Sequence, residues 1–138
     1  MTTMTAPHDP YHAARSELAS LRTQVTGVKG SIISGVDGLL VLHDLLTQAE
    51  PHDLAALAAA AYGIGRTCGA ALNQGNFSEC TVRSQGGYFA VYAIGDLALL
   101  AVLGDDGLNV ARLHIEARAV AARLSTQLSA QAMQQNLL

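Results

Sequence analysis

The segment Gly63-Ile64-Gly65-Arg66-Thr67-Cys68-Gly69 is the part of this chain that most resembles a nucleotide-binding motif. A dinucleotide fingerprint needs Gly-x-Gly-x-x-Gly directly after a strand, so that a helix N-terminus meets the pyrophosphate. Here the third glycine comes one position late, and the segment lies inside an expected helix. The chain also lacks the Gly-x-x-x-x-Gly-Lys-Ser/Thr loop that holds phosphates in GTPases. The sequence therefore predicts that these glycines serve helix packing.

The titratable residues show no spacing typical of a metal site or a catalytic group. His8 and His12 are four residues apart, but Pro10 lies between them, and we interpret the pair as chance. Cys68 and Cys80 fit no zinc spacing, and no serine lies in a nucleophile elbow. The Asp105-Asp106 pair is flanked by glycines and is typical of a capped loop rather than a calcium site. The sequence thus predicts no metal, no cofactor and no catalytic residue, and the protein is not expected to be an enzyme.

Two arginines remain as candidates for contact with another molecule. Arg66 is the lone cation on an otherwise almost uncharged helical segment, and Arg83 lies near the end of an expected strand. Either side chain is compatible with an ordinary ion pair at the surface or at a dimer seam. The sharper hypothesis is a contact with an acidic partner surface. Nothing in the sequence directs either arginine at a phosphate, so neither is predicted to be an arginine finger.

Composition limits the class of protein. The 138 residues suit one domain, and 50% are hydrophobic while only 14% are charged, against about 25% charged in an average domain. This shortage of charge indicates that the folded protein hides a large apolar area, as a homodimer does. A net charge of −3 with scattered Lys and Arg argues against nucleic-acid binding and against a polybasic membrane contact. No basic segment followed by an apolar one opens the sequence, and no clean run of about 20 apolar residues follows, so no signal peptide, a cytoplasmic location and reduced cysteines are expected.

Hydrophobic spacing and turn residues predict the order α-β-β-α-β-β-β-α. Asp37-Gly38 between two apolar runs predicts a tight hairpin between the first two strands. The expected helices cover residues 11–24, 54–74 and 108–128, and the expected strands cover residues 28–34, 39–43, 78–84, 88–94 and 97–103. Asp9 and Asp106 are the expected caps of the first and last helices. Residues 1–10 are expected to form a mobile tail, residues 11–130 the domain, and residues 131–138 a frayed end.

The sequence predicts the burial of two elements more specifically, the second strand and the middle helix. The second strand is apolar at consecutive positions, which predicts that both of its faces are covered. The middle helix has almost no charge and is expected to be buried nearly all round. Its apolar stripe is made of residues spaced by three and four, namely Leu54, Leu57, Ala61, Ile64, Cys68 and Leu72. Because glycine weakens a helix interior, its three glycines indicate the close approach of another backbone.

This order of elements, with these turns, resembles the roadblock family of dynein light chains and bacterial GTPase regulators, most closely the bacterial branch. The resemblance rests on Val28-Lys29-Gly30-Ser31-Ile32-Ile33-Ser34, on the hairpin Val36-Asp37-Gly38-Leu39, on the small-residue helix before Cys80-Thr81-Val82, and on the meander over residues 87–103 that leads into the last helix. It covers roughly residues 11–128. It implies an α/β (α+β) fold with a five-stranded antiparallel sheet in the order 2-1-5-4-3, covered by the middle helix on one face and the terminal helices on the other.

The resemblance also implies how the chain associates. Family members pair through the middle helix and the third strand. The apolar stripe is then expected to pack on the chain's own sheet, while the Ala/Gly surface meets the partner's copy. The candidate seam residues are Ala55, Ala59, Gly63, Ala70, Cys80 and Val82.

The function implied is that of a non-catalytic homodimeric regulator or adaptor. It would bind a small Ras-like GTPase and modulate its nucleotide cycle in bacterial signalling, with Arg66 and Arg83 as candidate contacts. A membrane histidine-kinase-like protein is a further partner under this hypothesis. A dimeric scaffold that leaves GTP hydrolysis unchanged is the main alternative, and a small-molecule sensor is a weaker one, since related profilin-like folds include ligand-binding sensors. The sequence leaves open which GTPase is bound and whether its hydrolysis is activated or inhibited.

Overall fold

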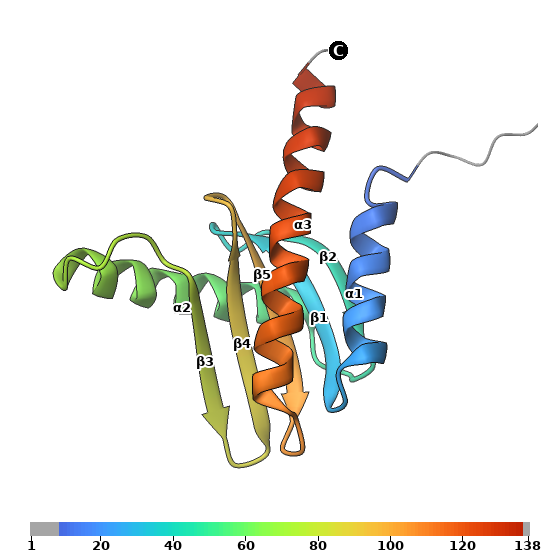
Figure 1. Cartoon of the computed structure of the whole chain (residues 1–138), viewed down its shortest axis with the longest axis vertical. Helices are drawn as coiled ribbons and strands as arrows, with labels where there is room; N and C mark the ends of the chain where they lie inside the picture. The colour runs from blue at the N-terminus through green and yellow to red at the C-terminus, as the bar shows by residue number, and fades with distance from the viewer. Residues whose placement is uncertain (1–8, 137–138) are drawn as a thin grey trace, which may run out of the picture.

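Five strands form one antiparallel sheet with helices on both faces (Figure 1). The computed structural model describes residues 9–136, with side chains described as far as residue 132. In chain order the elements are α1 (His12–Gln24), β1 (Val28–Gly35), β2 (Leu40–Leu45), α2 (Pro51–Ala71), β3 (Glu79–Ser84), β4 (Gly87–Ile94), β5 (Ala98–Asp105) and α3 (Val110–Asn136). The strand order is β2-β1-β5-β4-β3, so the predicted fold class and topology are confirmed.

The sheet separates two apolar cores. The larger core lies between the sheet and the pair α1 and α3, and includes Leu18, Ile33 and Leu124. The smaller core lies under α2 and includes Ile32 and Ala58. Neighbouring residues of a strand point to opposite faces, so Ile32 and Ile33 enter different cores. Strand β1 is therefore covered on both faces.

Strand β2 packs against both cores, with Leu42 on the side of α1 and α3 and Leu40 and Leu45 on the side of α2, but it is less covered than predicted. This strand lies at the edge of the sheet, and only Leu42 in it is fully buried, while Val41 is 39% exposed. The pairing with β1 shifts register between Ile33, which faces Leu42, and Ser34, which faces Leu40. Val41 thus lies at a bulge, where one residue of a strand has no partner opposite. Consecutive apolar residues here reflect that irregular edge.

Two helix ends differ from the expected ones. Helix α1 starts at His12 after Tyr11, and the Asp9 carboxylate accepts the N–H of Tyr11 before the helix instead of capping it. Helix α3 starts at Val110, where the Asn109 side chain accepts the N–H of Arg112, so Asp106 is not the cap. Helix α3 continues to residue 136, so residues 131–136 of the segment expected to fray are helical. Residues 1–8 and 137–138 of the two expected tails lie outside the described residues.

Helix α2 is rotated about its axis relative to the prediction, so that only Leu54 and Ala61 of the predicted stripe face the core. The residues that it buries are Leu54, Ala55, Ala58 and Gly69. Leu57 and Ile64, from the predicted inward stripe, are 56% and 69% exposed. Small side chains let a helix lie close to a sheet, because little more than a Cβ atom separates the two backbones. Within residues 9–136, none of the helices, α2 included, combines the length and the apolar character needed to cross a membrane.

The glycines of α2 have three different surroundings. A Cβ atom on Gly65 would collide with the ring of Phe77, and one on Gly69 would collide with the carbonyl of Gly75. A Cβ atom on Gly63 would meet nothing within 4 Å. The close backbone approach predicted from the glycines therefore exists at Gly69, but the approaching backbone belongs to the chain's own connection between α2 and β3.

We expect Gly69→Ala to destabilise the protein by about 1–3 kcal/mol, as overpacking of a tight contact does. Gly63→Ala is the matched control in the same helix, and it should be neutral or stabilise the protein by up to about 1 kcal/mol through better helix propensity. Urea unfolding of both variants measures the difference. Equal free energies of unfolding for the two variants would contradict the contact between Gly69 and Gly75.

Candidate functional site

Strand β3 is an open edge of the sheet that carries half-exposed apolar residues. It pairs with β4 on one side, and no strand lies on its other side in the described sheet. On the face of the sheet that α2 occupies, Val82 lies opposite Phe89, and Phe89 lies opposite Leu103. These three side chains form a row, which we call the apolar row, and none of them is fully buried; Val82 is 47% exposed. Helix α2 thus leaves part of its own side of the sheet uncovered.

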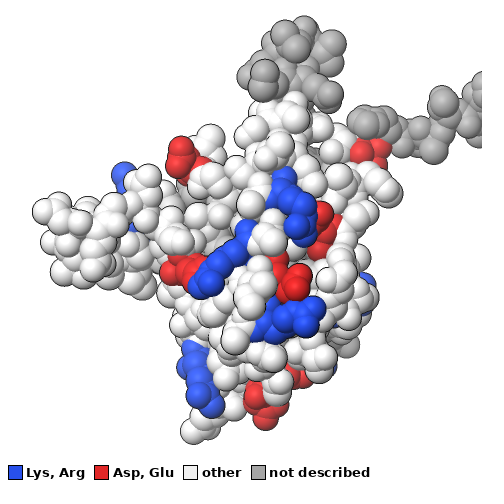
Figure 2. All heavy atoms as spheres, viewed as in Figure 1, with Lys and Arg blue, Asp and Glu red and all other residues white. Residues whose placement is uncertain are grey.

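The exposed side of α2 is also apolar. Helical spacing places Leu57, Ile64 and Cys68 on one flank of the helix and Tyr62 and Arg66 on the other. The first flank, which we call the apolar flank, has no charged residue after Asp53 in the first turn of the helix, and its members are exposed. Figure 2 shows charged side chains gathered over α3 and its surroundings, whereas the projecting end of α2 is almost uncharged. The apolar row and the apolar flank therefore give the α2 side of the molecule an uncharged surface.

The predicted seam residues are divided by the structure. Ala55 is fully buried against the chain's own sheet, so it cannot contact a second copy, and this prediction is corrected. Cys80 and Val82 lie on β3, on the side of the sheet that α2 occupies, and are half-buried and exposed respectively. Ala59, Gly63 and Ala70 line a shallow groove, together with Arg66, on the flank of α2 away from the apolar flank. The seam suggested by the sequence is thus divided between strand β3 and the flank of α2 that lines the groove.

Arg66 and Arg83 are both unpaired cations, but they lie on opposite faces of the sheet. The chain has eight Lys and Arg residues, all within the described part, and the other six form ion pairs there. Arg83 lies over the ring of Tyr88, 5.6 Å from its centre, and Tyr88 packs with the core under α1 and α3. Arg66 lies on α2. One small contact surface therefore cannot include both arginines of the same chain.

Charged groups tie the edge strand β3 to α3. The Arg118 guanidinium donates two hydrogen bonds to the Glu79 carboxylate, and this hydrogen bonding holds the pKa of Glu79 below its usual range. Beneath this pair, the Tyr92 hydroxyl lies 2.7 Å from Nδ1 of His114. Tyr92 is 2% exposed, and its burial raises the pKa of the phenol. On this face, α3 therefore contacts the start of β3, while Thr81 and Arg83 further along the strand are exposed.

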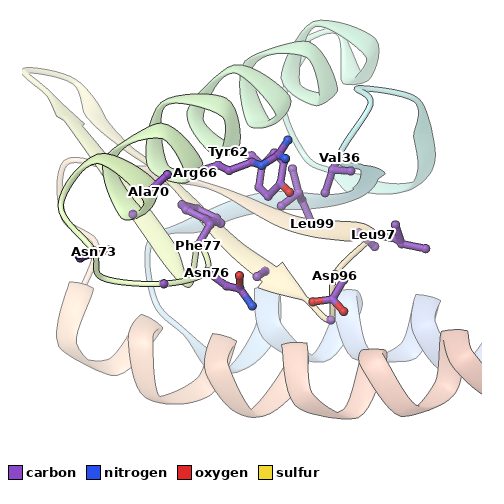
Figure 3. A pocket seen from close by; sticks show the side chains of 15 residues that line it. Val36, Tyr62, Arg66, Ala70, Asn73, Asn76, Phe77, Asp96, Leu97 and Leu99 are labelled. Atoms are coloured by element: carbon purple, nitrogen blue, oxygen red, sulfur yellow. The ribbon is translucent and has the colours of Figure 1, made fainter.

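A hollow of about 880 Å³ opens between α2 and the turn that joins β4 to β5 (Figure 3). Its polar side chains come from separate elements: Arg66 from α2, Asn73 and Asn76 from the connection to β3, and Asp96 from the turn. Phe77 supplies part of its apolar wall and meets the Tyr62 ring edge-on, at 5.6 Å between centres. Sequence reasoning missed this hollow, because Asn73, Asn76 and Asp96 look like ordinary helix-end and turn residues. The one sequence feature that could have indicated the hollow is Tyr62, an aromatic residue on a helix made mainly of Ala and Gly.

Comparison with known proteins identifies the domain type. The model of the family described as Roadblock/LC7 domain matches residues 15–104. The protein MJ1340 of Methanocaldococcus jannaschii, itself described only as uncharacterised, is 26% identical over 98 residues, which cover 71% of this chain and 85% of the relative.

Two solved structures show the same fold. The chain superposes on a Roadblock/LC7 domain from Streptomyces avermitilis with a TM-score of 0.77 and 23% identity, covering 83% of this chain and 96% of that one. It also superposes on MglB in a tetrameric arrangement, with a TM-score of 0.81 and 16% identity, covering 95% of this chain and 98% of the MglB chain.

We expect Glu79→Gln to lower the free energy of unfolding by a few tenths to about 1 kcal/mol at pH 7, the range for an exposed ion pair. The pKa of Glu79 is lower in the folded than in the unfolded chain, so the stabilisation is complete above the ordinary value of 4.5 and disappears as the pH falls through the folded pKa. Urea unfolding at pH 7 and at pH values below 4.5 measures whether the free energies of unfolding of the parent and of Glu79→Gln become equal in acid. Glu116→Gln, which breaks the local pair with Arg112 inside α3, is the control. A difference between parent and Glu79→Gln that persists unchanged in acid would contradict the ion-pair account.

Proposed function

The chain belongs to the Roadblock/LC7 domain family, and from this premise we propose that it is a non-catalytic regulator or adaptor that acts as a homodimer and binds a small Ras-like GTPase in the cytoplasm. Residues 11–130 would form the dimerising domain. The observation that carries the proposal is the uncharged surface formed by the apolar flank of α2 and the apolar row beside the open edge of β3. The family supplies the kind of partner, and this surface supplies the means of association.

The exposed apolar area supports association with a second copy. Soluble monomers rarely leave large contiguous apolar patches in water, and an unpaired strand edge is open to pairing with another chain. If β3 pairs with the β3 of a second copy, the sheet becomes continuous and the partner's α2 covers the apolar row. The resemblance to the roadblock family implies the same two elements. The solved MglB tetramer, at 16% identity, supports the capacity of this fold to self-associate.

The seam that we now propose differs from the one suggested by the sequence. Its centre is made of the exposed residues that flank the open edge, namely Leu57, Ile64, Cys68, Cys80 and Val82. Ala55 is excluded by its burial. Ala59, Gly63 and Ala70 lie on the side of α2 away from this seam. Small residues thus serve the intramolecular contact, and larger ones serve the intermolecular contact.

We expect the parent protein to have twice the 14.3 kDa monomer mass by light scattering at micromolar concentration. Ile64→Glu should shift the protein to monomer, because association would bury an unpaired carboxylate in an apolar seam. Ile115→Glu is a matched control, since Ile115 is 64% exposed on α3 and Ile64 is 69% exposed on α2. A parent protein of monomer mass, or a dimer unaffected by Ile64→Glu, would refute this seam.

Binding to a GTPase rests on the family and on the free cations. The chain has no phosphate-binding loop of its own, so any effect on GTP hydrolysis would come from reordering the groups of the partner. Arg66 and Arg83 carry the charges that are not used in ion pairs within residues 9–136, which leaves them available to an acidic partner. Arg66 and Arg83 lie on opposite faces of the sheet, so the variant that weakens binding shows which face the partner contacts.

Calorimetry with small Ras-like GTPases from the same organism, in their GDP-bound and GTP-analogue-bound forms, tests this function. We expect the affinity to depend on the nucleotide, since switch loops are ordered by the γ-phosphate. We expect Arg66→Glu to weaken binding and Arg83→Glu to leave it nearly unchanged if the partner docks on the α2 side. Equal affinity for both nucleotide states would favour a scaffold, because a ligand indifferent to two states cannot shift their balance. Absence of binding to the GTPase would remove the proposal.

A further inference from the structure

The hollow beside α2 lies outside the seam proposed above and has the construction of a ligand site. Its volume of about 880 Å³ is within the range of roughly 300–1,000 Å³ that is typical of small-molecule pockets. Its walls come from α2, from the α2–β3 connection and from the turns at one end of the sheet. The wall is held by the chain itself, since Phe77 packs on Gly65 and Tyr62 while Gly75 packs on Gly69. The shape of the hollow is therefore set without a partner.

Opposite charges face this hollow from different walls. Figure 3 shows Arg66 projecting from α2 beside Tyr62, and Asp96 projecting from the β4–β5 turn on the other side. Neither side chain takes part in an ion pair within residues 9–136. Asn73 and Asn76 add amide groups that can both donate and accept hydrogen bonds. The polar groups of the hollow are thus unused within the described chain, and their formal charges cancel.

This charge pattern selects among ligand classes. A nucleotide or other polyphosphate needs several cations or a cradle of backbone N–H groups, whereas this hollow offers one arginine and a repelling aspartate. A ligand with one anionic and one cationic group satisfies both side chains. Apolar side chains also line the hollow, among them the half-buried Phe77 and the exposed Leu97. An apolar body between the charged ends of the ligand therefore matches the hollow.

We propose that the hollow binds a small zwitterion of the amino-acid or short-peptide class, whose carboxylate meets Arg66 and whose ammonium group meets Asp96. A free amino acid and a short peptide with both ends free share this chemistry. Each extended residue adds about 3.3 Å, so a peptide of a few residues spans more of the hollow than a single amino acid does. The site lies on the flank of α2 away from the proposed seam, so a dimer leaves it open to the solvent.

Calorimetric titration of the full chain with the tripeptide Ala-Leu-Ala, its N-acetylated form, its C-terminal amide and free leucine tests the proposal. We expect the unmodified tripeptide to bind, and each blocked form to bind about tenfold more weakly or worse, as expected for the loss of one charge-assisted hydrogen bond. Tighter binding of leucine than of the tripeptide would assign the site to free amino acids, and the reverse order would assign it to peptides. No binding of either at millimolar concentration would overturn the proposal.

Two variants locate the binding in this hollow. In Arg66→Gln, the amide should bind as well as the free carboxylate, while acetylation still weakens binding. In Asp96→Asn, the acetylated form should bind as well as the free amine, while amidation still weakens binding. Arg83→Gln, on the other face of the sheet, is the control and should change neither preference. If both variants still prefer the free carboxylate over the amide and the free amine over the acetylated form, the proposal is overturned. Asp96→Asn also separates this site from the GTPase contact, because it should leave GTPase binding intact.

Discussion

The contact between the small-residue side of α2 and the sheet is the constraint on which the rest of the α2 face depends. Ala55 and Ala58 are completely buried there, and Gly69 is covered by the backbone of the α2–β3 connection. A larger side chain at Gly69 would push that connection away. The same contact forces the larger residues Leu57 and Ile64 outward. The apolar flank on one side of the helix and the hollow on its other side are thus both consequences of one close packing.

The two faces of the sheet differ in how many of their charged side chains form ion pairs within the chain. On the face of α1 and α3, arginines pair with acids on other elements: Arg118 with Glu79 ties α3 to β3, and Arg123 with Glu17 ties α3 to α1. These pairs satisfy most of the charges on this face, and Arg83, which lies over Tyr88, is the arginine there without an acidic partner among residues 9–136. On the α2 face, Arg66 is without a partner among the described residues, and the flank beyond it is apolar. The asymmetry indicates that the α2 face is the one available for association.

The elements themselves were predictable, because they depend on local periodicity and on turn chemistry. Asp37-Gly38 marks the hairpin, and Gly38 adopts the positive φ of +88° that such a turn needs. The strand order followed from the resemblance carried by the same turns and runs. The ends of α1 and α3 were less predictable, since Asp9 and Asn109 compete as caps with neighbours of similar chemistry. The predicted starts of α1 and α3 were in error by one and two residues, which is usual at helix ends, whereas the predicted C-terminal end of α3 was eight residues too early.

The sequence by itself determined which residues share a flank of α2, but only the tertiary structure decided which flank meets the sheet. Helical periodicity is a property of a single helix and contains no information about what lies against it. The stripe with Ile64 was assigned inward because larger apolar residues are more often buried, whereas close approach to the sheet favours Ala55 and Ala58. The hollow depends on folding in the same way, because Arg66 and Asp96 are 30 positions apart and face it from different elements. Local sequence patterns extend over a few turns of chain, and only the packing of α2 on the sheet brings such distant side chains to one place.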